Sequence, residues 1–193
     1  MQPSILIVDD EPSIIQSLSG LLNDEGFEAL SASNGFEALK VITAESPDLV
    51  LLDIWMPGMD GIETLKAIKK EHPYIQAVMI TGHGTIETAV RAIKLGAFDF
   101  IEKPLTIDKV VVAINNALNY RRLEEENRYL RKKTIEKNAI TGTSPSVMKL
   151  RQEIHAAAPS DAWILITGEN GVGKELVART IHHLSDRADA PLV

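Results

Sequence analysis

The segment that decides the fold is residues 49–61, which read LVLLDIWMPGMDG. Its first four residues are apolar, the fifth is Asp53, and residues rich in proline and glycine follow. A short, continuous apolar run is typical of a strand buried on both faces, as in a parallel sheet. Asp53 therefore lies at the carboxyl edge of such a sheet, where open α/β folds bind their ligands. An aspartate that only caps the next turn has the same local pattern, so Asp53 alone does not identify a site.

Four other apolar runs resemble this strand, and segments with helical spacing separate them. The expected strands are residues 5–8, 27–32, 49–52, 77–80 and 98–101. The expected helix faces are Ile14/Leu18/Leu21, Ile62/Leu65/Ile68 and Ile86/Val90/Ile93, with helix ends at Gly26 and Gly96. The sequence therefore predicts an α/β fold with a doubly wound, five-stranded parallel sheet of order 2-1-3-4-5, like that of flavodoxin. Its second strand is interrupted by polar residues, which suits an edge position.

Composition limits the class of protein. The 193 residues are 45% apolar and 24% charged, which is ordinary for a globular protein with one full domain and a small or incomplete second one. No apolar stretch has the length of a membrane span and no charged leader precedes an apolar segment, so we expect a cytoplasmic protein without a membrane partner. The absence of cysteine excludes disulfides and thiolate chemistry, and the net charge of −7 argues against a general nucleic-acid surface.

A long helix follows the last strand. Its first part should cover the sheet through Ile107, Val111, Ile114 and Leu118. The apolar spacing then continues, alternating between three and four residues, through Tyr120, Leu123, Asn127 and Leu130. This spacing predicts a parallel coiled-coil seam of about two heptads and hence a homodimer. A solvated, charged linker helix is the alternative interpretation.

A second α/β unit begins after the turn-forming residues 141–146. We expect a helix over about residues 146–157 and a strand over residues 163–167. The loop GENGVGK at residues 168–174 follows, and then a helix. This is the spacing and context of a Walker A phosphate-binding loop, which predicts a nucleotide site at Gly168, Gly171, Gly173, Lys174 and Glu175. Glu175 is a departure, because the general motif has Ser or Thr there to contact magnesium.

Further polar residues follow the other predicted strands. Asp9 and Asp10 come directly after the first strand, Thr81 ends the fourth, and Lys103 follows the fifth. Neighbouring carboxylates repel one another, so the three aspartates should need a cation to stay ionised at neutral pH. Mg²⁺ is the expected ion, since it binds through one or two carboxylates and keeps several waters.

These residues resemble a known family. The segments VDDE at 8–11, LD at 52–53, MPGMDG at 56–61, TG at 81–82 and EKP at 102–104 resemble the receiver domain of two-component response regulators, over residues 4 to about 120. The resemblance implies that Asp53 accepts a phosphoryl group from a sensor histidine kinase. It also implies that Asp10 and Asp53 bind Mg²⁺, that Asp9 acts mainly through a metal-bound water, and that the carbonyl of Trp55 completes the protein ligands.

The chemistry of these residues agrees with that role. An ionised Asp53 can attack a phosphoryl group in line while the cation and Lys103 neutralise the charge of the transferring oxygens. The proline after Lys103 makes a cis peptide bond plausible there. Trp55 and His83 lie two positions beyond the acceptor and the threonine, where they would flank the path of an attacking water.

Thr81 is the expected sensor of phosphorylation. A dianion on Asp53 would offer acceptor oxygens to its hydroxyl, and an inward movement of Thr81 would open space for Phe100. The resemblance implies that this pair forms the switch. A permanent place for Phe100 in the core is the alternative.

The second unit also resembles a family. Residues 140–144, ITGTS, and the loop variant with Glu175 are similar to the ATPase domain of sigma-54-dependent activators, in particular response regulators of the NtrC and NtrX type. We expect a receiver domain at residues 1–120, a helical linker at 121–139 and the first part of the ATPase domain at 140–193. The chain would then be the N-terminal part of a longer transcription activator. ATP binding would require the complete protein, and contacts with sigma-54 RNA polymerase and DNA would require domains that follow Val193.

The predicted function is a phosphorylation-controlled signalling module that acts through dimer geometry on a transcription-activating ATPase. We expect no enzyme activity beyond its own phosphorylation and dephosphorylation. A stand-alone receiver that acts as a phosphate sink or adaptor is the alternative. An active nucleotide hydrolase is disfavoured, because the motifs for hydrolysis are missing before Val193.

Overall fold

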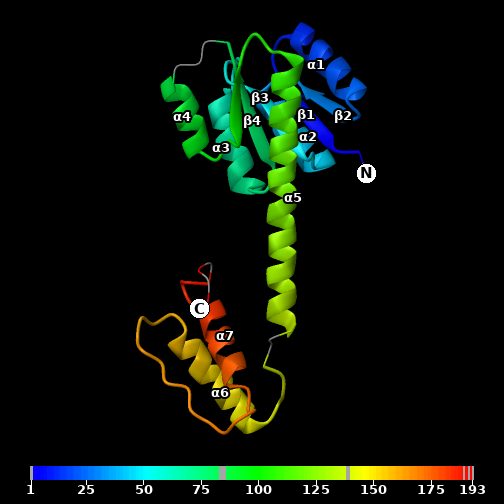
Figure 1. The fold of residues 1–193 in the computed structure, drawn as a ribbon. Helices are drawn as coiled ribbons and strands as arrows, with labels where there is room; N and C mark the ends of the chain where they lie inside the picture. The colour runs from blue at the N-terminus through cyan, green and yellow to red at the C-terminus, as the bar shows by residue number, and fades with distance from the viewer. Residues whose placement is uncertain (1, 83–85, 138–139, 189, 191, 193) are drawn as a thin grey trace. The chain divides into compact units, whose positions relative to one another are not determined.

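The computed structural model describes residues 2–82, 86–137, 140–188, 190 and 192. The chain divides into two compact units, Met1–Glu124 and Glu125–Val193. The first unit contains a five-stranded sheet (Figure 1) of β1 Ser4–Val8, β2 Glu28–Ala32, β3 Leu49–Asp53, β4 Gln76–Thr81 and β5 Asp99–Glu102. Every pairing is parallel and the order is β2-β1-β3-β4-β5. The predicted fold class and strand order are confirmed, with β2 at an edge.

The sheet has a hydrophobic core on each face, because successive side chains of a strand point to opposite sides. In β3, Leu49 and Leu51 belong to one core, and Val50 and Leu52 belong to the other. The first core is closed by α1 Pro12–Asp24 and α5 Ile107–Lys137. The second is closed by α2 Gly35–Glu45, α3 Gly61–Glu71 and α4 Ile86–Lys94. Continuous apolar strands are therefore buried on both faces, as the sequence predicted.

Capping residues fix the starts of the helices that follow β2 and β3. Asn34 accepts a hydrogen bond from the N–H of Glu37 at the start of α2, and Asp60 accepts one from the N–H of Glu63 at the start of α3. These bonds satisfy N–H groups that the first turn of a helix leaves unpaired. The N-terminus of α3 is held next to the end of β3 by the N–H of Gly61, which donates to the carbonyl oxygen of Ile54 at 3.0 Å.

The predicted inward face of α4 is wrong. Ile86, Val90 and Ile93 share one face of the helix, but they are 84%, 46% and 44% exposed. The helix packs on its alanine side instead, where Ala89 and Ala92 are buried. Small side chains let the helix approach the sheet closely, so the bulky apolar stripe lies on the outside.

The first part of α5 also differs from the prediction. Ile107 is 59% exposed, and the residues fully buried against the sheet are Val110, Ala113, Ile114 and Ala117. Of the four predicted core positions, Ile114 is buried, and Val111 and Leu118 are half-buried. The expected helix is present, but its buried stripe is rotated toward Val110.

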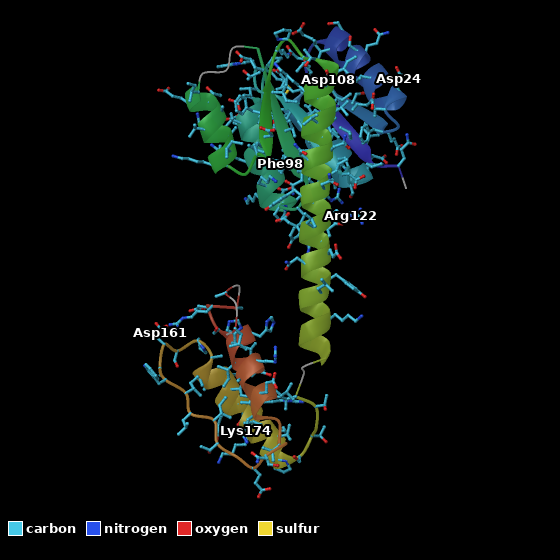
Figure 2. All side chains as sticks on the ribbon, viewed as in Figure 1. Asp24, Phe98, Asp108, Arg122, Asp161 and Lys174 are labelled. Atoms are coloured by element: carbon cyan, nitrogen blue, oxygen red, sulfur yellow. The ribbon has the colours of Figure 1, made fainter. Side chains whose placement is uncertain are left out.

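The second half of α5 carries the predicted coiled-coil seam. Leu123 and Leu130 are 65% and 53% exposed, and Asn127 is exposed. Tyr120 has a contact within the first unit, since its ring lies 5.5 Å from that of Phe98, which is labelled in Figure 2. Parallel dimerisation through this seam stays a prediction.

No described helix is both long enough and apolar enough to cross a membrane.

The second unit contains α6 Pro145–Ala157 and α7 Lys174–Leu184. The strand predicted at residues 163–167 is wrong, because these residues form no strand in the structure. Trp163 and Leu165 are 103% and 88% exposed. A strand needs neighbouring strands to pair its N–H and C=O groups, and the described residues of this unit provide none. After α5, the described residues of this unit therefore form two helices joined by an irregular segment.

Candidate functional site

The polar residues predicted from the strand ends meet at the carboxyl edge of the sheet. Asp9 follows β1, Asp53 ends β3, Thr81 ends β4, and Lys103 follows β5. The strands β1, β3 and β4 are direct neighbours, and Asp53 pairs with Ile80 in the register of β3 and β4. Because every strand is parallel, all four side chains lie at the same edge.

Lys103 joins the two buried carboxylates. Its Nζ atom lies 3.0 Å from Asp9 Oδ2 and 3.0 Å from Asp53 Oδ1. The side chain of Asp9 is completely buried, that of Asp53 is 4% exposed, and that of Lys103 is 21% exposed. The peptide bond between Lys103 and Pro104 is cis, which the sequence suggested. One ammonium group therefore contacts both acids at the edge of the sheet.

Main-chain N–H groups hold the remaining carboxylate oxygens. Asp9 Oδ1 accepts a hydrogen bond of 2.9 Å from the N–H of Glu11, and Asp53 Oδ2 accepts one of 2.7 Å from the N–H of Trp55. Each aspartate thus has one oxygen on Lys103 and the other on the loop that follows its own strand. The orientation of Asp53 is fixed by two different elements.

Burial and charge have opposite effects on the pKa values of Asp53 and Lys103. Burial raises the pKa of Asp53, and the negative charge of Asp9 adds to the rise, while Lys103 and the N–H of Trp55 oppose it. Burial lowers the pKa of Lys103, but its hydrogen bonds and charge interactions with Asp53 and Asp9 outweigh burial, so this pKa is raised overall. Lys103 is therefore a permanent cation near neutral pH.

Thr81 contributes an unsatisfied hydroxyl. The residue is 1% exposed, and its Oγ1 atom has no hydrogen-bond partner among the residues that the structure describes. A buried polar atom without a partner costs about 1–3 kcal/mol of stability. An acceptor oxygen placed on Asp53, at the end of the neighbouring strand, would remove this cost.

Other predicted residues lie at the periphery. Asp10 is exposed, Trp55 is 61% exposed, and Phe100 is 44% exposed. The exposed ring of Phe100 argues against a permanent place in the core, which was the alternative. His83 lies outside the described residues.

The donor set fits Mg²⁺ by its chemistry. Asp9 and Asp53 are two carboxylates that share one lysine, which leaves a net negative charge, and Asp10 follows Asp9 directly. Among the described residues, no three acidic or histidine side chains converge on a common point. Mg²⁺ does not require such a cluster, because it binds through one or two carboxylates with carbonyl and water oxygens. Asp10, Asp53, the carbonyl of Trp55 and, through a water, Asp9 are oxygen donors of this kind.

Glu11 is a residue of the site that sequence reasoning missed. Its N–H holds Asp9, and its Oε1 atom lies 3.9 Å from Lys103 Nζ. The signal was its spacing, since an aspartate often accepts a hydrogen bond from the N–H two residues later. Glu11 therefore helps to fix Asp9 and adds a weak ion pair at the rim.

The predicted phosphate loop lies in the second unit, before α7. Gly168, Gly171 and Gly173 have φ angles of 158°, 81° and 94°, which glycine adopts far more readily than other residues. Lys174, labelled in Figure 2, donates to the carbonyl oxygens of Gly168 at 2.8 Å and Glu169 at 2.7 Å. The lysine that would contact a phosphate is bound here to the start of its own loop.

Glu175 has a different partner. Its Oε1 atom accepts hydrogen bonds of 3.0 Å and 2.7 Å from Nε and an Nη atom of Arg179, one turn later in α7. This exposed pair stabilises the first turns of α7 by about 0.3–0.5 kcal/mol. The side chain that replaces the usual Ser or Thr therefore contacts its own helix.

Comparison with known proteins agrees with the geometry. Residues 5–115 match the response regulator receiver domain, and residues 140–193 match the sigma-54 interaction domain. The nitrogen assimilation regulatory protein NtrX of Azorhizobium caulinodans is 48% identical over the whole chain, which covers 43% of that relative. The chain thus spans less than half the length of the curated relatives that it matches.

Solved structures give the same picture. The crystal structure of NtrX from Brucella abortus in complex with ATP has 46% identity and a TM-score of 0.72, covering all of this chain and 43% of that one. The crystal structure of the receiver domain of Brucella abortus NtrX has 49% identity and a TM-score of 0.58, covering 60% of this chain and 98% of that one.

Proposed function

The chain belongs to the response regulator receiver family of two-component systems, and from that premise we propose that Asp53 accepts a phosphoryl group from a sensor histidine kinase. The observation that supports this most is the environment of the carboxylate. Asp53 is buried at the edge of the sheet, with one oxygen 3.0 Å from Lys103 Nζ and the other 2.7 Å from the N–H of Trp55. A carboxylate that only capped a turn would not need an ammonium group at ion-pair distance.

The reaction is a phosphoryl transfer to a carboxylate. A carboxylate oxygen of Asp53 forms a bond to phosphorus while the bond from phosphorus to the donor's nitrogen or oxygen breaks. The leaving group keeps the electron pair of that bond, and the product is an acyl phosphate. The ionised form of Asp53 needs no general base. Bound Mg²⁺ would neutralise negative charge on the phosphoryl oxygens.

Lys103 and Asp9 prepare this step. The ammonium of Lys103 supplies positive charge next to the attacking carboxylate, and it is itself held by Asp9 at 3.0 Å. A preorganised charge stabilises the transition state without reorganising during the reaction. Removing Asp9 would leave Lys103 free to pair with Asp53 alone.

Thr81 and Phe100 form the proposed switch. The unpaired Oγ1 atom of Thr81 would donate a hydrogen bond to a phosphoryl oxygen on Asp53. Movement of Thr81 toward Asp53 would open space into which the exposed ring of Phe100 could turn. Trp55, which is exposed beside the acceptor, and His83 would control access of water to the acyl phosphate.

We further propose that residues 1–120 form the receiver, residues 121–139 a helical linker that dimerises through its apolar seam, and residues 140–193 the first part of the sigma-54 interaction domain. In the whole protein, phosphorylation would act through the linker on an ATP-binding domain that activates sigma-54 RNA polymerase. Contacts with polymerase and DNA are proposed only for parts outside this chain.

Phosphorylation with a small donor tests the proposal. The chain is incubated with acetyl phosphate and Mg²⁺, and intact mass spectrometry counts phosphoryl groups. We expect one group on the wild-type chain, released by hydroxylamine as an acyl phosphate should be, and none on Asp53→Asn. Asp60→Asn is the matched control, because it makes the same chemical change in the loop that follows β3 and should be labelled normally. Full labelling of Asp53→Asn would remove Asp53 from this role.

A further inference from the structure

A glycine lies against the main chain of the phosphoacceptor. The loop after β3 turns back, and Gly61, the first residue of α3, donates its N–H to the carbonyl oxygen of Ile54 at 3.0 Å. A Cβ atom on Gly61 would lie 2.1 Å from the carbonyl oxygen of Asp53, 2.9 Å from its carbonyl carbon and 2.8 Å from Cα of Ile54. No side chain fits at this position without movement of the main chain.

Neither the main chain of Asp53 and Ile54 nor the first turn of α3 can move away easily. Asp53 is held in the sheet by its pairing with β4, and the N–H of Ile54 donates to the carbonyl oxygen of Ile80 at 3.0 Å. On the other side, α3 is fixed by its cap at Asp60 and by a fully buried Leu65. A group added at residue 61 would therefore displace the Asp53–Ile54 peptide, the first turn of α3, or both.

The need for glycine at residue 61 is one of space and not of backbone conformation. Gly61 is not among the residues with positive φ, whereas Gly58 in the same loop has φ of 83°. Alanine would be acceptable to the local backbone of Gly61, as it is in most helices. Only the close approach of α3 to Asp53 excludes a side chain.

We propose that Gly61 is a positioning residue for the phosphoacceptor: it lets α3 close onto the main chain of Asp53 and thereby fixes the carboxylate between Lys103 and the N–H of Trp55. This inference rests on the proposed role of Asp53. The two contacts that define the carboxylate, 3.0 Å to Lys103 and 2.7 Å to Trp55, leave little tolerance. A displacement of reacting groups by about 1 Å can slow an enzyme-like reaction by on the order of 100-fold.

The chain offers a matched control at the equivalent position of α2. Gly35 is the first residue of that helix, and a Cβ atom there would lie 2.2 Å from Thr64 Oγ1 and 2.9 Å from Met59 Cγ. These obstacles are side-chain atoms: Thr64 Oγ1 belongs to α3 and donates to the carbonyl oxygen of Asp60 at 2.8 Å, and Met59 belongs to the loop before α3. Gly35→Ala therefore adds the same methyl group at a comparably crowded site beside α3, but it meets no main-chain atom of Asp53.

The first experiment compares Gly61→Ala with Gly35→Ala in the 193-residue chain. Phosphorylation by acetyl phosphate with Mg²⁺ is timed for each variant at the same temperature interval below its own Tm. We expect Gly61→Ala to react at least about 10-fold more slowly than wild type, and Gly35→Ala to stay within about threefold. Equal rates for wild type and Gly61→Ala, or an equal loss in both variants, would overturn the inference.

A spectroscopic signal separates positioning from general destabilisation. The amide proton of Trp55 donates a short hydrogen bond to a carboxylate, so its NMR resonance reports the place of Asp53 without any phosphoryl donor. Gly61→Ala should move this resonance upfield, and Gly35→Ala should leave it in place. An unmoved Trp55 resonance in a folded Gly61→Ala chain contradicts the inference.

A second pair of variants covers the case in which Gly61→Ala does not fold. Asp60→Ala removes the cap that holds the first turn of α3, while Asn34→Ala removes the equivalent cap from α2. Asp60→Ala should slow phosphorylation and shift the amide resonance of Trp55. Asp60→Asn should keep the wild-type rate and resonance, because asparagine also caps a helix. Asn34→Ala should change neither the rate nor the resonance. The same rate and resonance in Asp60→Ala as in wild type would overturn the inference.

The outcomes distinguish this inference from the proposed function. If the wild-type chain is labelled somewhere other than Asp53, the proposed function fails, whatever the Trp55 resonance shows. If Asp53 is the acceptor and Gly61→Ala reacts at the wild-type rate, only the role of Gly61 fails.

Discussion

Asp53→Asn should raise the free energy of unfolding of the unphosphorylated chain. Folding buries the Asp53 carboxylate, and burial raises its pKa although Lys103 and the N–H of Trp55 oppose the rise. A group whose pKa is raised by folding adds stability that is fully present below its unfolded pKa, about 3.9, and is lost as pH rises through the folded pKa. Asparagine has nearly the same shape and no charge, so it keeps the favourable neutral form at every pH.

The expected gain is modest. Each unit of pKa corresponds to about 1.4 kcal/mol, and the ion pair with Lys103, which the variant loses, offsets part of the burial cost. Lys103 stays paired with Asp9 at 3.0 Å, so it is not left alone in a buried place. We therefore expect a gain on the order of 1 kcal/mol, or a rise in Tm of about 4 °C for a domain of this size.

Thermal unfolding with a chelator present, from about pH 4 to about pH 8, measures this gain. The difference between variant and wild type should be largest near pH 8 and should shrink as pH falls toward the folded pKa of Asp53, where the wild-type carboxyl becomes neutral. Asp48→Asn is the control, since it removes the same charge from a carboxylate that is 34% exposed and bound to Arg121, and it should lower stability. A less stable Asp53→Asn at pH 8, or a gain that does not depend on pH, would refute the reasoning.

Three other outcomes follow from contacts of the first unit and the linker. Arg121 Nη1 lies 2.5 Å from Asp48 Oδ1. A double-mutant cycle with Arg121→Ala and Asp48→Asn, measured by urea unfolding, should give a coupling energy of about 0.5–1 kcal/mol. Additive effects of the two substitutions would show that the pair contributes nothing. Thr81→Val removes the buried hydroxyl that lacks a partner and should stabilise the unphosphorylated chain by about 1 kcal/mol. The rise in Tm on adding beryllofluoride and Mg²⁺ should be smaller in Thr81→Val than in wild type. An equal rise in both would exclude Thr81 as the sensor. Light scattering should show a dimer in at least one of two conditions, without or with beryllofluoride. The dimer should become a monomer when the exposed Leu123 and Leu130 are both changed to serine. A wild-type chain that is monomeric in both conditions would favour the adaptor interpretation.

The sequence was sufficient for the sheet because each strand carried its own signal. Residues 49–52 and 77–80 are apolar throughout, and such runs are stable only when both faces are covered. The strand ends then placed Asp9, Asp53 and Lys103 at one edge of the parallel sheet, where the structure shows Lys103 3.0 Å from each carboxylate. Local pattern and tertiary structure agreed, so little else was needed.

The errors arose where tertiary contacts outweigh local pattern. The stripe of Ile86, Val90 and Ile93 is the most apolar face of α4, yet Ala89 and Ala92 are the residues that allow close packing. Residues 163–167 have the composition of a strand, but a strand forms only beside others. No pattern in the sequence distinguishes a helix face that contacts the sheet through small residues from one that leaves them exposed.

Gly61 shows the same limit at the level of the site. Sequence reasoning noted it as part of a family segment, but a glycine with ordinary backbone angles has no local signature of its importance. Its role depends on the loop that brings α3 back to the main chain of Asp53. A Cβ atom at residue 61 would lie 2.1 Å from the carbonyl oxygen of Asp53. Only the folded chain shows which glycines are needed for space.

Strand β3 links the proposed site to a contact with α5. Asp53 ends the strand, and Asp48 directly precedes it, where its carboxylate holds Arg121 of α5 and accepts the N–H of Ser4 at 2.8 Å. All residues of β3 are buried, and a five-residue strand spans only about 17 Å. Because a close-packed strand does not bend locally, a change in the position of Asp53 is resisted at Asp48 as well. The ion pair between Asp48 and Arg121 of α5 therefore lies at the opposite end of the same buried strand from Asp53.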